Sequence, residues 1–246
     1  MLSFLSFRKK RALDFQEQIR FFFDKINRKE NFTLARYADG ERAVLRGIAI
    51  KGIDGWATQN VLSKLGKDLW KTINHSESNY YYGISCPCCD KNAFSWYLKF
   101  IPHHDNLTFS NLFVNDNYRF FQEYFPKIEE QAIVIAHRNG LGKPIGNLEV
   151  IRYYSTENNC IEYWDTEGDT FVGKIIKETK NFKNMLFVIS ACPMSEVIIH
   201  RLYEANPENR YIDFGSAIDA YVHARMTRLY MDDTQIFSQK ICKISI

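Results

Sequence analysis

The chain has 246 residues, of which 46% are hydrophobic and 25% charged, and its formal net charge is +3. These values fit a globular protein that buries a substantial core as one large domain. The weak charge, without a dense stripe of Lys and Arg, argues against nucleic acid as a partner. Every apolar run falls short of the ~20 residues that a membrane-spanning helix requires.

The N-terminal sequence "MLSFLSFRKKRALDF" places its basic cluster after a short apolar stretch, which is the reverse of a secretory signal. A frayed terminus is the favoured interpretation, and the alternative is a weak peripheral membrane contact through residues 1–11, with Phe4, Leu5 and Phe7 inserting. Because a secretory signal is lacking, the six cysteines are expected to be reduced thiols. The expected location is therefore the cytoplasm, including the inner face of the membrane.

Segments of helical periodicity alternate with short apolar or aromatic runs that are typical of strands. The first half of the chain predicts a helix over 12–30, a strand over 32–38, a glycine-containing turn with a short helix, a helix over 57–73, a strand over 79–85, a helix over 92–101 and a strand over 107–113. There follow a helix over 115–128, a strand over 131–137, a helix over 171–182, a strand over 184–191, a helix over 194–206, a strand over 210–215 and a helix over 216–231.

Strands that alternate with helices need crossover connections, so we expect an α/β fold with a largely parallel sheet flanked by helices. The chain is expected to be a single domain, with an N-terminal helical segment (1–30), an α/β core (31–232) and a C-terminal tail (233–246). Ligands of such sheets bind beyond the carboxyl ends of the strands. The loops to consider are therefore those at 38–42, 190–195 and 213–219.

The first loop, "ADGE", contains two carboxylates separated by a glycine. If Asp39 to Glu41 is extended, both side chains project to the same side and offer oxygen ligands to Mg²⁺ or Mn²⁺ beside a diphosphate. Gly40 would let the backbone approach a phosphate, and Arg36 would add positive charge. The alternative, which the spacing alone favours, is an exposed Asp-Gly turn followed by a helix with Glu41 in its first turn.

The second loop, "SACPMSE", follows a buried strand and opens a helix. Free backbone N–H groups at the start of this helix, in the loop that contains Ser190, Pro193 and Ser195, could bind a phosphate of a nucleotide. Plain helix capping by Ser190 or Ser195 is the alternative.

The third loop, "IDFGSAIDAY", places Asp213 at a strand end and Gly215 in the turn that follows. Asp213 could reach a ribose hydroxyl, as acidic residues do at strand ends in nucleotide-binding sheets. Capping by Ser216 with a surface Asp219 is an equally good interpretation.

Two further groups carry reactive side chains. Cys86, Cys88 and Cys89 lie in "CPCC", whose spacing does not match the paired spacing of a structural zinc site, so thiols packed near the ligand are favoured. His137 follows the strand at 131–137 and could transfer a proton or contact a phosphate, although an ordinary polar loop residue fits the pattern slightly better.

The segment "FTLARYADGE" resembles the RFGDGE-type signature of the GT-D glycosyltransferases, a bacterial family first described as a domain of unknown function. The segment at 188–222 is similar to the closing segment of that family, and "QAIVIAHRNGLG" fits its central strand. The resemblance implies a Rossmann-like fold, a nucleotide-sugar donor such as a UDP-sugar, and Mn²⁺ or Mg²⁺ at the D-x-E pair. By position, Asp39 and Glu41 would bind metal and diphosphate, Arg36 would support them, and Asp213 and Gly215 would line the nucleotide side.

The sequence departs from the family pattern at three places. Ala38 stands where the signature has Gly, Ser216 where the family often has His, and "ACP" where a Gly-Pro turn is usual.

The expected function is that of a metal-dependent, hexosyltransferase-type glycosyltransferase in cell-surface polysaccharide biosynthesis. It would transfer a sugar from a nucleotide-diphosphate sugar to a glycan, glycolipid or glycoprotein, and an inverting reaction would need a base such as His137 or Asp116. Two alternatives stay open: a non-catalytic nucleotide-binding module, and a cytoplasmic zinc or thiol protein built on Cys86, Cys88 and Cys89.

Overall fold

The structure is a computed structural model of the whole chain, and it describes residues 15–51, 57, 61–87, 89–101 and 104–232. Residues 1–11, for which a membrane contact is the alternative to a frayed terminus, lie outside the described residues, as do Cys88, the side chain of Asp116 and the tail at 233–246. Among the helices of the described residues, none combines the length and the apolar character needed to span a bilayer.

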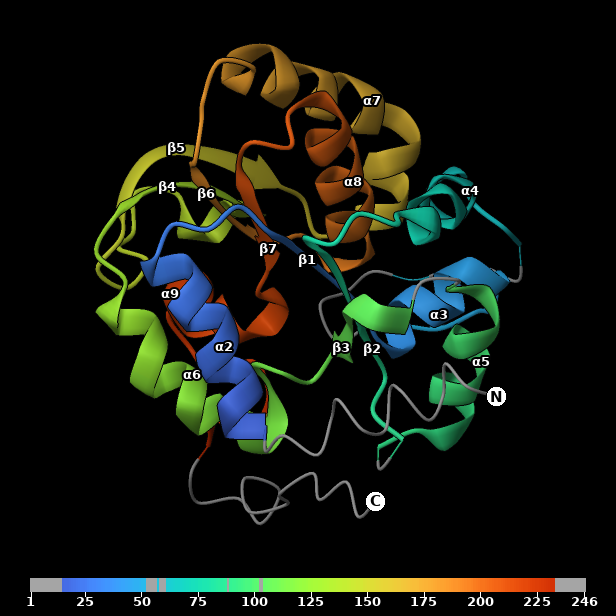
Figure 1. Cartoon of the computed structure of the whole chain (residues 1–246). Coiled ribbons are helices and arrows are strands. Elements are labelled where there is room, and N and C mark those ends of the chain that lie inside the picture. Colours follow the sequence, from blue (N-terminus) through green and yellow to red (C-terminus); the bar gives the residue numbers. More distant parts are fainter. Residues whose placement is uncertain (1–14, 52–56, 58–60, 88, 102–103, 233–246) are drawn as a thin grey trace.

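The strands are β1 (Thr33–Tyr37), β2 (Tyr80–Ile84), β3 (Leu107–Phe109), β4 (Gln131–His137), β5 (Glu149–Thr156), β6 (Leu186–Ser190) and β7 (Arg210–Asp213). They form one seven-stranded sheet in the order β3-β2-β1-β7-β6-β4-β5 (Figure 1). Every neighbouring pair is parallel, which confirms the predicted α/β fold with its parallel sheet.

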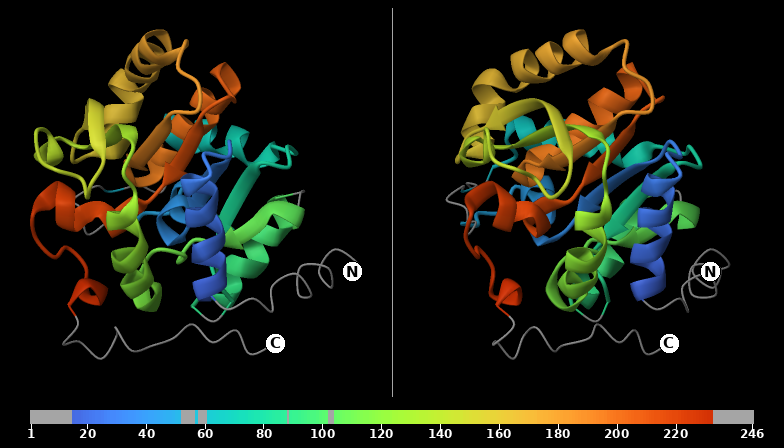
Figure 2. Two further views of the ribbon diagram at one scale, coloured as in Figure 1. Left: turned by 60° about the vertical axis from the view of Figure 1, so that its left-hand side comes forward. Right: turned by 90° about the vertical axis from the view of Figure 1, so that its left-hand side faces the viewer.

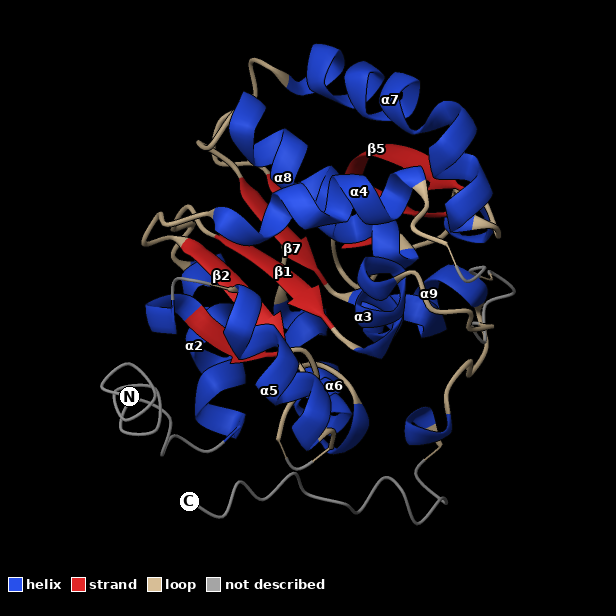
Figure 3. Cartoon of the chain, turned by 90° about the vertical axis from the view of Figure 1, so that its right-hand side faces the viewer, coloured by secondary structure: helices blue, strands red, loops and turns tan. Residues whose placement is uncertain are grey.

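The helices are α2 (Phe15–Asn27), α3 (Asp39–Arg46), α4 (Lys64–Lys71), α5 (Lys91–Phe100), α6 (Tyr118–Tyr124), α7 (Cys160–Thr179), α8 (Ser195–Ala205) and α9 (Asp219–His223). Helices α3, α4, α5, α7 and α8 pack on one face of the sheet, and α2, α6 and α9 pack on the other (Figures 1 and 3). Figure 2 shows α2 and α6 side by side on their shared face.

Side chains of the central strands alternate between these two apolar layers, as the period of a strand requires. In β1, Leu34 packs toward α2 and α6, whereas Ala35 and Tyr37 pack on the opposite face. In β6, Val188 and Ile189 are divided between the layers in the same way. Strands that are buried on both faces appear in the sequence as continuous apolar runs, which is why β4 and β6 could be predicted closely.

The structure differs from the predicted elements where burial is one-sided or a turn intervenes. Strand β5 was not predicted, because it is an edge strand whose first half is only partly buried. The helix predicted over 57–73 begins only at Lys64, after its N-cap Ser63. The helix predicted over 216–231 is divided, since α9 ends at His223 and Ala224 takes a left-handed conformation with φ of 53°. The helix predicted over 171–182 is the second half of the longer α7, and only Leu107–Phe109 of the predicted strand 107–113 is extended.

Candidate active site

A cleft of about 1660 Å³ lies at the edge of the sheet where the strands end. Because all strands are parallel, the loops that follow them meet at this one edge, as expected for a sheet of this kind. The cleft is lined by every residue that the sequence assigned to the site: Arg36, Asp39, Gly40, Glu41, His137, Ser190, Pro193, Ser195, Asp213 and Gly215.

The D-x-E residues are not extended. Asp39, Gly40 and Glu41 form the first turn of α3, where a spacing of two residues places side chains on nearly opposite sides. Asp39 is exposed, whereas Glu41 is buried and accepts a hydrogen bond of 2.7 Å from the N–H of Ala38, as a capping-box glutamate does. The expectation that both carboxylates project to the same side is therefore wrong, and the turn-then-helix interpretation describes the local backbone.

The burial of Glu41 changes its acidity. Burial, with a smaller contribution from the negative charges of Asp213 and Asp39, raises the pKa of Glu41 to about 7, although hydrogen bonds from the backbone N–H groups of Ala38 and Glu41 oppose the rise. Near neutral pH this carboxyl group is thus divided between its protonated and ionised forms. Within the described part of the chain, no three Asp, Glu, His or Cys side chains already converge as a metal site.

Arg36 is the cation at the base of the cleft. It is 7% exposed, and its Nε donates to the backbone oxygen of Asp213 at 2.7 Å and to Oδ2 of Asp213 at 3.0 Å. Its Nη1 donates to the backbone oxygen of Ser110 at 2.6 Å. Arg36 therefore connects the ends of β1, β3 and β7 and holds a positive charge at the point where they meet.

Two glycines make room for Arg36. Gly83 lies opposite it on β2, and a Cβ at Gly83 would approach Cγ of Arg36 to 3.0 Å. Gly215 has φ of +49°, and a Cβ there would overlap Nη2 of Arg36. The glycine of "IDFG" was visible in the sequence, but its function of accommodating an arginine from β1 was not.

The carboxylate of Asp213 is hydrogen-bonded to other groups of the protein. Its Oδ1 accepts the N–H of Gly215 at 2.9 Å, and its carboxylate also bonds to Arg36 and to the side chain of Ser195. Burial raises the pKa of Asp213 and outweighs the lowering by Arg36, Gly215 and Ser195. Asp213 thus lies at the predicted place, but it is held inward by Arg36.

The loop between β6 and α8 is tightly folded. Oγ of Ser195 accepts the N–H of Ala191 at 2.9 Å. This serine therefore stabilises the loop in addition to its hydrogen bond with Asp213. Cys192 lies in the left-handed region with φ of 52°, which is a costly conformation for a residue with a side chain. Pro193 is the second residue of a short 3-10 turn, Cys192–Met194, that leads into α8, and Ser190 ends β6 at the wall of the cleft.

His137 lies at the end of β4 with both ring nitrogens engaged. Its Nδ1 accepts the N–H of Asn139 at 3.2 Å, so the proton resides on Nε2, which donates to Oδ1 of Asn158 at 2.7 Å. The ring of His223 lies 5.1 Å away, centroid to centroid. To act as a base, His137 would have to release the N–H of Asn139.

Glu196 is a buried acid that no pattern in the sequence singles out. It is 1% exposed, and its Oε2 has no hydrogen-bond partner among the described residues. Burial raises its pKa well above the usual range, and the charges of Glu41 and Asp213 add to the rise. In the sequence it is an ordinary glutamate in the first turn of a helix, and its burial results from the packing of α8 against β1 and β7.

Two arginines that follow α9 line the cleft, and the sequence analysis did not assign them to the site. Arg225 is exposed and lines the cleft, and Arg228 lines it too while lying 3.7 Å from Oδ2 of Asp219. The sequence placed both on a continuous helix, and the left-handed residue Ala224 is what directs them to the cleft.

Cys86 and Cys89 line the cleft near the end of β2. Cys86 is disulfide-bonded, so the expectation of reduced thiols is wrong at this position. A sulfur in a disulfide is not a thiolate ligand, and this weakens the zinc alternative.

No protein-family model matches the chain, and no curated protein matches it either. The chain is similar to the solved structure of domain of unknown function 1792, described as highly conserved and as having a distinct glycosyltransferase fold. The TM-score is 0.54, with 15% identity over 82% of this chain and 78% of that chain. A new glycosyltransferase (DUF1792) from Streptococcus sanguinis gives a TM-score of 0.55, with 14% identity over 82% of this chain and 81% of that chain. At these identities the likeness establishes a shared fold, which confirms the Rossmann-like, GT-D-type architecture that the sequence resemblance implied.

Proposed function

We propose that this protein is a metal-dependent glycosyltransferase that takes a sugar from a nucleotide-diphosphate donor, with a UDP-sugar favoured, in the cytoplasm. The acceptor would be a glycan, glycolipid or glycoprotein precursor of a cell-surface polysaccharide. The observation that carries the proposal is the convergence of all predicted site residues on one cleft, in a fold shared with a protein described as a glycosyltransferase.

The residues present fit a hard divalent cation that is shared with the donor. Asp39 offers an exposed carboxylate in the cleft. Glu41 lines the same cleft from another side of the first turn, and it would offer a second carboxylate only after it ionises and its side chain turns away from the N–H of Ala38. Since two carboxylates leave several positions open, the diphosphate and water would complete the set of oxygen ligands. When bound, Mn²⁺ or Mg²⁺ would neutralise the negative charge that develops on the departing diphosphate.

The protein's own groups would orient the donor. Gly40 brings the first-turn N–H groups of α3 into the cleft without a side chain, so a phosphate can approach them. Arg36 supplies positive charge at the base of the cleft, and the exposed Arg225 adds a second positive charge to its lining. The loop from Ser190 to Ser195, together with Asp213 and Gly215, would border the nucleoside side.

His137 is proposed to contact the donor or the acceptor through its Nε2–H, which would exchange its hydrogen bond to Oδ1 of Asn158 for one to the ligand. The lone pair of its Nδ1 is used by the N–H of Asn139, so the role of general base would first require that bond to open.

The test is the melting temperature of the protein against a panel of nucleotide sugars, each with Mn²⁺ and with EDTA. A donor that binds only the folded state raises the melting temperature according to its excess over Kd. We expect a shift that requires metal, is lost in Asp39→Asn and persists in Glu157→Gln, a control that removes another carboxylate lining the same cleft. The absence of any shift at millimolar nucleotide would contradict a donor site. A metal-dependent shift without sugar transfer to any acceptor would instead favour the non-catalytic binding module.

A further inference from the structure

The rim of the cleft beside α9 carries exposed apolar side chains. Two segments form this rim: the loop at 138–143, which follows β4, and the segment at 224–231, which follows α9. Leu141 is 62% exposed, Met226 62% and Leu229 64%, and these are the three most exposed large apolar side chains of the described residues. Single exposed apolar residues are common on protein surfaces, but three that share one rim indicate a surface that makes contacts.

The two segments are joined at the end of α9. Nδ2 of Asn139 bonds to Nδ1 of His223 at 3.2 Å, and Nζ of Lys143 donates to the backbone oxygen of Val222 at 3.3 Å. Figure 2 shows the loop after β4 and α9 on the same side of the molecule. Leu141 therefore lies on the side of the protein from which the segment after α9 continues.

Internal contacts fix the path of the segment at 224–231. The left-handed residue Ala224 ends α9, and Tyr230 returns to the core, where its hydroxyl bonds to Ser216 at 2.7 Å. Between these two points, Oγ1 of Thr227 donates to Oδ2 of Asp219. Because the polar side chain of Thr227 is bound to the protein, the segment stays in place with the apolar side chains on either side of it exposed.

The same rim is basic. The sequences "RNGLGK" (138–143) and "ARMTRLYM" (224–231) contain no acid and four cations: Arg138, Lys143, Arg225 and Arg228. Arg138 pairs with Glu157 at 2.8 Å, and Arg228 lies 3.7 Å from Asp219. No carboxylate of the described residues is bonded to Lys143 or to Arg225. Two positive charges of the rim are therefore available to an external anion.

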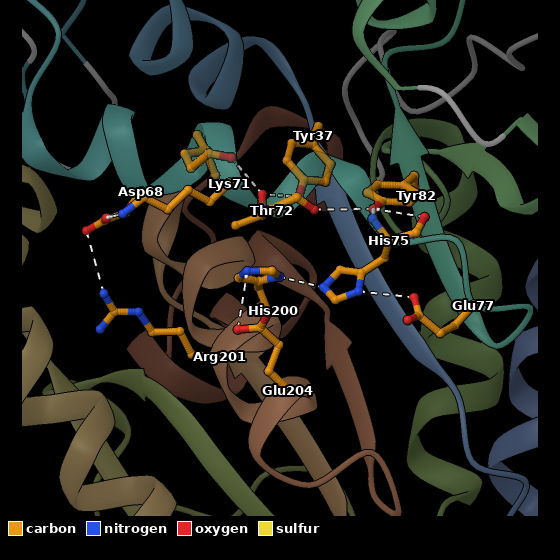
Figure 4. A network of polar contacts seen from close by, with 11 residues as sticks. Tyr37, Asp68, Lys71, Thr72, His75, Glu77, Tyr82, His200, Arg201 and Glu204 are labelled. Atoms are coloured by element: carbon orange, nitrogen blue, oxygen red, sulfur yellow. Dashed lines mark hydrogen bonds and ion pairs between the residues drawn. The ribbon is translucent and has the colours of Figure 1, made fainter.

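Cations on the other face of the sheet differ in this respect. Lys71 bonds to Asp68 at 2.7 Å, and Nη2 of Arg201 lies 3.7 Å from the same carboxylate (Figure 4). Arg201 also bonds to Asp169 at 2.6 Å. Partners of this kind weaken the attraction of a cation for an external anion, and they are lacking at the two rim cations among the residues that the structure describes.

The docking rim consists of three apolar residues and two cations: Leu141, Met226, Leu229, Lys143 and Arg225. We propose that the docking rim binds the surface of an anionic lipid bilayer. Apolar side chains of such a surface enter the boundary between headgroups and acyl chains, while Lys and Arg stay at the headgroups. Each cation close to anionic lipids adds to the attraction. Since the apolar area is small, the binding is reversible and depends on both kinds of contact.

Docking would bring the cleft to the bilayer, because Arg225, Met226 and Leu229 line the cleft as well as the rim. This has a consequence for the acceptor, which rests on the proposed function. A sugar acceptor that is anchored in the bilayer by a lipid would be presented directly to the cleft, so a glycolipid is the class of acceptor that the docking rim favours.

The experiment is co-sedimentation of the full-length protein, without nucleotide sugar, with phosphatidylcholine vesicles that contain about 30% phosphatidylglycerol. We expect binding that falls at least ~10-fold on pure phosphatidylcholine or in about 0.5 M NaCl. The double variant Met226→Ser/Leu229→Ser should weaken binding at least ~10-fold, and Lys143→Gln about 5-fold. Val61→Ser and Lys67→Gln are the matched controls, since they change an exposed apolar and an exposed cationic side chain outside the docking rim, and both should bind as the wild type does.

All of these variants change exposed side chains, so each should melt at the temperature of the wild type, which shows that it folds. Equal vesicle binding by the wild type and by folded Met226→Ser/Leu229→Ser would overturn the proposal. So would binding that is lost in Phe4→Ser/Phe7→Ser and kept in the rim variant, because the contact would then lie in residues 1–11.

An absence of binding to anionic vesicles would also overturn the proposal. If the protein then self-associates in solution and Met226→Ser/Leu229→Ser does not, the rim is an interface with a second copy of the chain. Because vesicle binding is measured without a donor, its failure beside a metal-dependent thermal shift with a nucleotide sugar would remove the docking rim and leave the proposed function intact.

Discussion

Gly215 lies directly against Arg36, with a left-handed φ of +49° and no space for a Cβ beside Nη2 of the guanidinium. Gly215→Ala should therefore displace Arg36 from Asp213 and destabilise the protein by about 2–4 kcal/mol, from backbone strain and overlap together. Urea unfolding measures this loss. The same substitution should also reduce donor binding, since Arg36 is the fixed cation of the cleft.

Gly142→Ala is the matched control for that substitution. Gly142 has φ of +77°, but a Cβ there would meet nothing within 4 Å. It should therefore cost only the backbone strain, about 1 kcal/mol. Equal losses of stability in the two variants would mean that the overlap of the added methyl group with Arg36 does not destabilise the protein.

The buried ion pair between Arg36 and Asp213 leads to a second prediction. Asp213→Asn keeps the size of the side chain but leaves the guanidinium without its counter-ion, which should cost about 3 kcal/mol. Glu208→Gln, which breaks the exposed pair with Lys183, should cost less than about 1 kcal/mol. Denaturant unfolding of both variants at pH 7 compares them, and a similar loss in each would show that burial does not strengthen the dependence on Asp213.

The order of strands and helices was readable from the sequence because most strands are covered on both faces. A short, continuous apolar run such as 131–137 predicts a strand that is buried on both faces, and the structure places β4 at those residues. Strand β5 has no such run, since it lies at the sheet edge and mixes Glu149 and Arg152 with apolar residues. Its position depends on pairing with β4, which only the folded chain supplies.

Which residues line the cleft was predicted better than the directions in which their side chains point. Parallel strands must end at one edge, so residues at strand ends could be grouped from the sequence alone. The direction of each side chain depends on contacts across the sheet, as with Arg36, which reaches Ser110 and Asp213. Glu196 could not be found in this way, because its burial arises from tertiary packing of α8.

Asp39 and Glu41 should differ in their effect on sugar transfer. Asp39→Asn removes the exposed carboxylate offered to the metal and should lower kcat/KM at least ~100-fold, without loss of stability. Glu157→Gln, a control in the same cleft, should change it less than ~3-fold. The comparison is made with the donor identified by thermal shift, at saturating Mn²⁺. Full activity in Asp39→Asn would remove this residue from the proposed metal site.

Glu41 should make stability fall as pH rises in metal-free protein. Its pKa is about 7 when folded, against an ordinary value of 4.5, so the folded state binds more protons than the unfolded state between these values. The unfolding free energy contributed by this group is thus highest below pH 4.5 and is lost as pH rises through 7. Glu41→Gln keeps an oxygen for the Ala38 N–H. As pH rises from 4.5 to 8, its free energy of unfolding should increase by about 2–3 kcal/mol relative to that of the wild type. Parallel pH profiles of the two proteins would show that Glu41 ionises normally.

Asp68 should have the opposite pH dependence. It joins α4 to α7, because it accepts from Lys71 at 2.7 Å and from Lys64 at 3.0 Å, both in α4, and from Nε1 of Trp164 in α7 at 3.0 Å. Burial raises its pKa, but these three hydrogen bonds outweigh burial and hold the pKa well below the ordinary 3.8. The unfolded state therefore binds more protons below that value, and the stabilisation by Asp68 is present above pH 4 and lost as pH falls further. Asp68→Asn should cost about 1–2 kcal/mol at pH 7, after allowance for solvent around the lysines, and progressively less below pH 4. Urea unfolding of both proteins at pH 7, 5 and 3 gives the difference, and a difference that stays constant down to pH 3 would show that the charge of Asp68 does not stabilise this junction.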